Sequence, residues 1–164
     1  MGPFFLTKGD LGHYNLFMSE LQINKDAAWV MIFIAWIFAA IATLGSLFFS
    51  EIMLYPPCVL CWYQRICMYP LVALFLVGLF PISKSVVRFT LPLVCIGFFT
   101  AIYHNLLYYK ILPESAAPCV QGISCTTVHI QWLGFITIPL LSLIAFSLIL
   151  TLLILTYRKL AYEK

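Results

Sequence analysis

Four long apolar runs constrain what this chain can fold into more than any other feature of its sequence. They cover residues 27–49, 62–80, 89–109 and 132–155. A helix of about 20 apolar residues is long enough to cross the hydrocarbon core of a bilayer. Because 63% of the residues are hydrophobic and only 9% are charged, the chain lacks the polar surface of a water-soluble domain. We therefore predict an all-α fold, an integral membrane bundle of four helices that forms one domain.

The two ends of the chain differ in composition from the four runs. Residues 1–26 mix apolar residues with charges and glycine, and contain no unbroken apolar stretch that resembles a signal-peptide core. We expect them to form a cytoplasmic tail, either flexible or folded as a short helix on the membrane surface, because Phe17 and Leu21 lie at helical spacing. Residues 156–164 are expected to form a second cytoplasmic tail.

The basic residues predict which loops face the cytoplasm. Four spans place both termini on one side of the bilayer, and Lys/Arg residues concentrate on the cytoplasmic side. Only Arg65 and Lys110 would lie opposite the termini, whereas the other seven would lie with them: Lys8, Lys25, Lys84, Arg88, Arg158, Lys159 and Lys164. The loops at residues 51–61 and 111–131 are therefore predicted to be extracytoplasmic. Since the basic residues form no cluster, we expect no nucleic-acid partner.

The first cysteine pair, Cys58 and Cys61, lies directly before the second span. Its C-x-x-C spacing suits redox cycling, because two thiols this close can form a disulfide and the second can resolve a mixed disulfide made by the first. A helix that starts near Cys61 would turn its N–H groups and positive dipole end toward that sulfur. This placement favours the thiolate over the thiol.

Two further polar residues belong to the predicted spans. Arg65 follows Cys61 by four residues, so on a helix the two share a face, with Arg65 about one turn deeper. It either extends back to the lipid headgroups or serves the cysteine pair. His104, near the outer end of the third span, is either a packed residue or a second polar contact for a cofactor headgroup.

The second pair, Cys119 and Cys125, lies in the other outer loop, where Gly122 can supply a turn. Outside the cytosol the pair is expected to oxidise. Alone it would be read as a structural staple, but a redox-type pair on the same side favours a redox role. A zinc site of four cysteines is an alternative, which the wide spacing of this pair disfavours, and we predict no metal. Cys67 and Cys95 lie inside spans and are assigned no role.

Oxidation of thiols needs an electron acceptor. The sequence has no dinucleotide-binding glycine motif, no haem signature and no iron–sulfur pattern. A quinone dissolved in the bilayer is therefore the expected cofactor. It would need an apolar slot between helices with a few polar groups at its carbonyls, and Arg65 and His104 are the candidates for those groups.

Several stretches resemble a known family. Residues 57–65, PCVLCWYQR, resemble the hallmark of DsbB-like disulfide-forming proteins of bacterial membranes. Residues 102–104, 117–125 and 131–139 are similar in order and spacing to the BdbC branch of that family. The resemblance extends over about residues 30–155.

The resemblance implies a quinone-dependent oxidoreductase that supports disulfide formation in exported proteins. Cys119 would be attacked by a reduced, exported thioredoxin-fold oxidase of the DsbA/BdbD type, and Cys125 would resolve the mixed disulfide. Electrons would then pass to Cys58 and Cys61. The second pair is closer together than in the enterobacterial DsbB proteins, so the partner must approach close to the membrane.

At the other end of the path, the resemblance implies that the Cys61 thiolate contacts a menaquinone or ubiquinone. Arg65 would lie beside it, and His104 would be a second contact. Two alternatives remain. A vitamin K epoxide reductase type is disfavoured because its active C-x-x-C lies near the last spans. A non-catalytic membrane scaffold or metal-binding module with paired cysteines belongs to a different class.

Overall fold

The computed structural model describes residues 8–80, 82, 84–113 and 137–161, with side chains described from residue 18 onwards. Cys119, Gly122 and Cys125 lie outside the described residues. Every regular element in the described part of the chain is helical: α1 (Lys8–Leu47), the π-helix η1 (Phe48–Ile52), α2 (Val59–Gly78), α3 (Lys84–Tyr108) and α4 (Ile138–Ala161).

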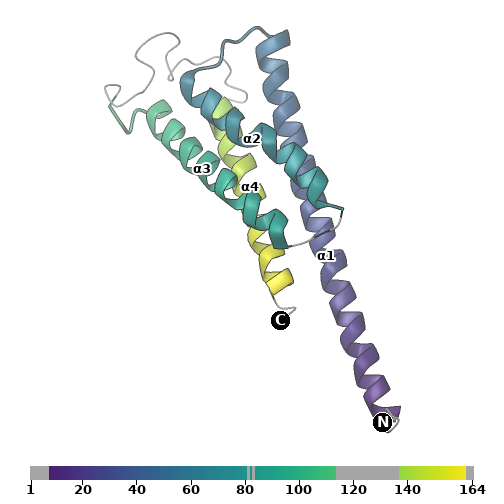
Figure 1. The fold of residues 1–164 in the computed structure, drawn as a ribbon. Helices are drawn as coiled ribbons and strands as arrows, with labels where there is room; N and C mark the ends of the chain where they lie inside the picture. The colour runs from purple at the N-terminus through teal and green to yellow at the C-terminus, as the bar shows by residue number, and fades with distance from the viewer. Residues whose placement is uncertain (1–7, 81, 83, 114–136, 162–164) are drawn as a thin grey trace.

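The four α-helices form a bundle in which α1 packs on α2 and α4, and α3 packs on the same two helices. Figure 1 shows that the start of α1 and the end of α4 lie toward one end of the bundle, whereas η1 and the start of α2 lie at the other. All four are long and apolar enough to cross a membrane. Helices satisfy their own backbone groups, which lipid requires. The predicted all-α bundle of four membrane helices is confirmed.

Helix α1 is longer than the first predicted span. It runs for 40 residues without a break at residue 26 or 27, and it extends beyond the other helices in Figure 1. Residues 8–26 are therefore helical but continuous with the span, instead of forming a separate short helix. The absence of glycine and proline from residues 13–44 permits this continuity. Gln22 also donates to Asp26 one turn later, at 3.3 Å.

The other helix boundaries also differ from the predicted ones. Helix α2 begins three residues before residue 62, because Cys58 caps it. Helix α3 begins at Lys84, five residues before the predicted start of the third span at residue 89, so Lys84 and Arg88 both belong to it. Helix α4 continues to Ala161, beyond residue 155, and residues 132–136 lie outside the described part.

The bundle interior is built from apolar side chains of all four helices. Its fully buried members include Ile32, Ala35, Ala39, Leu71, Phe75, Val94, Ala101, Phe146, Ile149 and Leu153. Two glycines permit close helix packing at this core. A Cβ at Gly97 on α3 would overlap the Phe146 ring of α4, and a Cβ at Gly78 would overlap the side chain of Val86.

Replacing Gly97 by Ala should therefore destabilise the bundle, by about 1–3 kcal/mol, which is the usual cost of overpacking a core. The matched control is Gly45→Ala on α1, where an added Cβ meets nothing within 4 Å. Thermal unfolding of the purified protein in detergent should show a lower midpoint for Gly97→Ala only. Equal midpoints for the two variants would contradict this view of the α3–α4 contact.

Candidate redox site at the start of the second helix

The first cysteine pair forms the start of helix α2. Cys58 and Cys61 are joined by a disulfide, with their Cα atoms 5.0 Å apart. Cys58 is the N-cap residue, with extended backbone, and its Sγ accepts a hydrogen bond from the Cys61 amide at 3.2 Å. The Cys58 carbonyl accepts from the Trp62 amide at 3.1 Å. The sulfur thus satisfies one of the first N–H groups of the helix, which have no partner within it.

We predicted that the helix start acts on the sulfur of Cys61; in the structure Cys61 does lie in the first turn of α2, and the hydrogen bond from this turn goes to the sulfur of Cys58. Cys61 is the third residue of α2, and the amide points at the sulfur of Cys58. The positive end of the helix dipole and the N–H donor both favour negative charge on Cys58 when the disulfide opens. Cys58 is also the more enclosed sulfur, since it is 6% exposed whereas Cys61 is half-buried.

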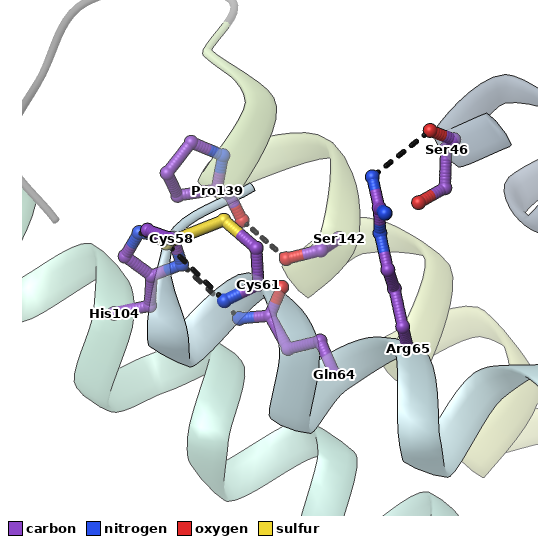
Figure 2. Close-up of a disulfide and its surroundings, with 8 residues drawn as sticks. All are labelled: Ser46, Cys58, Cys61, Gln64, Arg65, His104, Pro139 and Ser142. Atoms are coloured by element: carbon purple, nitrogen blue, oxygen red, sulfur yellow. Dashed lines mark hydrogen bonds between the residues drawn. A yellow bond between two sulfur atoms is a disulfide. The ribbon is translucent and has the colours of Figure 1, made fainter. Parts of the chain in front are cut away.

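A buried histidine lies beside this disulfide. His104 of α3 is 2% exposed, and its Nε2 lies 3.8 Å from the Sγ of Cys58. Its Nδ1 lies 3.2 Å from the Nε2 of Gln64, one turn along α2 from the cysteines. An amide nitrogen can only donate, so Nδ1 accepts, and a neutral ring then carries its proton on Nε2. Figure 2 shows these side chains converging on the disulfide.

Gln64 is a site residue that the sequence interpretation missed. It is buried, and it follows Cys61 by three residues, which places the two on one face of a helix. A buried amide in a membrane span costs free energy unless it is hydrogen-bonded. That rule could have singled out Gln64, although the sequence does not reveal that His104 is its partner.

Arg65 is directed toward α1. Its Nη2 donates to the backbone carbonyl of Ser46 at 3.1 Å, and its guanidinium carbon lies 5.5 Å from the centroid of the Trp62 ring. Figure 2 shows it reaching from α2 across to Ser46. Tyr69 donates to the hydroxyl of the same serine at 3.5 Å. Within the described residues most of the five N–H donors of Arg65 stay available to a ligand.

Asn105, the neighbour of His104, ties α3 to the first turn of α4. Its Nδ2 donates to the carbonyls of Ala101 and Pro139, both at 2.8 Å. Ser142 also donates to the Pro139 carbonyl at 2.8 Å. The start of α4 is thereby held next to the disulfide, as Figure 2 shows for Pro139 and Ser142. The sequence interpretation missed Asn105 as well.

A cavity of about 400 Å³ opens beside the disulfide, between α1, α2 and α4. Polar groups gather in one part of its lining: Ser46, Cys58, Cys61, Gln64, Arg65, Tyr69, His104 and Ser142. The other part is apolar and includes Phe38, Ile41, Ala42, Ile144, Ala145 and Leu148. Small-molecule sites in proteins commonly combine a mostly apolar wall with a few polar groups.

Cys58, Cys61 and His104 also bring their ligand atoms within 4.8 Å of one another. Zinc binds thiolates, however, and the two sulfurs here are bonded to each other. In this oxidation state the cluster therefore does not fit a metal site. Cys67 and Cys95 are free thiols, the first buried in the core and the second half-buried on α3.

The fold and the disulfide define a class, the multi-pass membrane proteins with a thiol–disulfide site at the end of a span. Comparison with protein families specifies it further. The family model described as "Disulfide bond formation protein DsbB" matches residues 25–156. The chain belongs to the DsbB family, and the resemblance seen in residues 57–65 is confirmed. Its role is that of a membrane disulfide-forming oxidoreductase.

Individual relatives agree with this assignment. "Disulfide bond formation protein C" of Bacillus subtilis (strain 168) is 47% identical over 121 residues, which cover 74% of this chain and 88% of the relative. "Probable disulfide formation protein C" of Halalkalibacterium halodurans is 44% identical, and the match covers 70% of this chain and 84% of the relative. "Probable disulfide formation protein" of Metapseudomonas resinovorans is 38% identical, and the match covers 80% of this chain and 92% of the relative. No solved structure matches the chain.

Counting thiols tests the redox state of the site. A variant with Cys119→Ser and Cys125→Ser, denatured without a reductant, should react with two equivalents of a maleimide, at Cys67 and Cys95. After reduction it should react with four, because Cys58 and Cys61 are released. Adding Cys58→Ser should give three without a reductant. Four reactive thiols before reduction would show that the first pair is not a disulfide.

Proposed function

We propose that this protein reoxidises an exported thioredoxin-fold oxidase of the DsbA/BdbD type and passes the electrons to a membrane quinone. The path runs from Cys119 and Cys125 to Cys58 and Cys61. It would support disulfide formation in exported proteins of a bacterium, with the cysteines on the extracytoplasmic side of the cell membrane. One observation carries the proposal: the Cys58–Cys61 disulfide borders an apolar cavity with cationic and hydrogen-bonding groups beside it.

The cavity has the volume of a small-molecule site, about 400 Å³, and its lining has the chemistry that a prenylated quinone needs. On α1 its lining changes from apolar Phe38 to polar Ser46, and on α4 it changes from Leu148 to Ser142. The chain directions of these helices are opposite (Figure 1), so both serines lie toward the same end of the bundle, and Figure 2 shows Ser142 beside the disulfide and Ser46 beside Arg65. A quinone has polar carbonyls on its ring and an apolar tail, so Arg65, Gln64 and His104 would hold the ring.

The reaction balances with the quinone as oxidant. A dithiol partner that becomes a disulfide loses two electrons and two protons. A quinone would take up these two electrons and two protons and become a quinol. Thiol–disulfide exchange first transfers the electrons to Cys119 and Cys125, and a second exchange opens the Cys58–Cys61 bond. The family resemblance assigns the quinone contact to Cys61, the less buried sulfur.

Each sulfur of the first pair has its own stabilising groups. Cys58 lies beside the imidazole of His104, and it accepts from the Cys61 amide. Gln64 orients the imidazole so that the proton on Nε2 faces this sulfur. Arg65 follows Cys61 by one turn on α2, so its positive charge would favour a thiolate at Cys61, although the guanidinium itself binds the Ser46 carbonyl of α1. A thiolate formed at Cys58 when the disulfide opens would have both the imidazole and the Cys61 amide as partners.

A non-catalytic scaffold is the second candidate, because a disulfide can also act as a static staple. A staple needs neither a cavity nor a buried histidine and glutamine at its sulfur. The arrangement of His104 and Gln64 around Cys58 therefore favours a redox-active pair.

The positive-inside bias of the sequence supports an extracytoplasmic site with cytoplasmic termini.

Loss of either cysteine pair should abolish the reaction. Cys58→Ala and Cys119→Ala should each reduce quinone-dependent oxidation of the partner to the uncatalysed background, because each removes one exchange step. Cys95→Ala is the matched control and should keep wild-type activity, since that thiol is free and does not line the cavity. Quinone absorbance follows the reaction. Appreciable activity in either of the first two variants would refute the proposed path.

Replacing Arg65 should affect the use of quinone more than the thiol chemistry. Arg65→Ala removes a charge-assisted hydrogen bond, so we expect the quinone KM to rise about tenfold or more, with a smaller change in kcat. Arg88→Ala is the control, because Arg88 is exposed and lies on α3 away from the cavity lining. An unchanged KM in Arg65→Ala would exclude a contact between this guanidinium and the quinone.

A further inference from the structure

Three glycines of the helical bundle differ in what surrounds their missing side chains. At Gly78 and Gly97 an added Cβ would overlap Val86 and Phe146, so close packing accounts for both. At Gly45 an added Cβ meets nothing within 4 Å. A glycine inside a helix is less favourable than alanine, because it loses more conformational freedom on folding. Packing among the residues that the structure describes therefore gives no reason for glycine at position 45.

Gly45 lies in the wall of the cavity beside the disulfide. On α1 it follows Phe38 and Ile41 and directly precedes Ser46, whose carbonyl binds Arg65. It therefore lies at the level on α1 where polar Ser46 follows apolar Phe38, Ile41 and Ala42, and the next lining residue, Phe49 of η1, is apolar again. A helix rises about 1.5 Å per residue, so this level is roughly 10 Å from Phe38. On α4, small Ala145 follows Ser142 one turn deeper along the same wall.

We infer that Gly45 is a specificity-determining residue that leaves room for the isoprenoid tail where the tail joins the quinone ring. The inference rests on the proposed function. With the ring held by Arg65 at the polar end, the tail must pass this level to reach the apolar part of the lining. A side chain at position 45 would extend into the passage and exclude tailed quinones. Quinone rings without a tail would still reach the polar end.

The test compares quinone binding by three full-length proteins in detergent: wild type, Gly45→Leu and Leu44→Phe. Leu44 is 66% exposed and does not line the cavity, so its variant adds bulk to the lipid-facing side of the same helix. The ligands are menadione, which has no tail, and its geranylgeranyl derivative. A benzoquinone without a tail and its decyl derivative form a second pair. Quenching of tryptophan fluorescence gives each Kd without turnover.

Gly45→Leu should weaken binding of the tailed quinones about tenfold or more, because the tail loses the burial of several methylene groups. Its Kd for the tail-less quinones should stay within about twofold of wild type, and Leu44→Phe should match wild type for all four. Unchanged Kd values for the tailed quinones in Gly45→Leu would overturn the inference, as would an equal loss for tailed and tail-less ones. If wild type itself bound no quinone, the proposed function would fail with it.

Discussion

The first turn of helix α2 is the point on which the rest of the site depends. A helix that starts near a lipid boundary has N–H groups without backbone partners, and here the sulfur of Cys58 accepts one of them. The reactive group is therefore part of the structure that begins the span. Because Cys58, Cys61, Gln64 and Arg65 fall within the first two turns of one helix, their relative positions are set by helical geometry.

Helix α3 holds this turn in place and connects it to α4. Two neighbouring residues do this in different directions, since His104 contacts Cys58 and Gln64 whereas Asn105 binds the Pro139 carbonyl of α4. Buried polar groups of this kind are costly unless paired, so each contact narrows the arrangements that the helices can adopt. The cavity is what remains between α1, α2 and α4 once these contacts are made.

The overall architecture could be predicted from the sequence, because the free energy of transfer into lipid depends on composition over long segments. The four spans, the membrane class and the family followed from apolar runs and from residues 57–65. The residues at which the helices start did not follow from these runs, because single capping side chains such as Cys58 determine them. The roles of Gln64 and Asn105 were missed because each has a partner on another helix, His104 on α3 and Pro139 on α4, and the sequence does not reveal which helix faces meet.

We propose that the Cys58–Cys61 pair delivers its electrons directly to a quinone in the adjoining cavity. The most direct measurement uses the variant with Cys119→Ser and Cys125→Ser, reduced, freed of reductant and mixed with a quinone without oxygen. We expect about one quinol per chain while the two thiols of the pair disappear, because oxidation of one dithiol to a disulfide releases two electrons and two protons, which reduce one quinone. Thiols that persist beside unreduced quinone would contradict it.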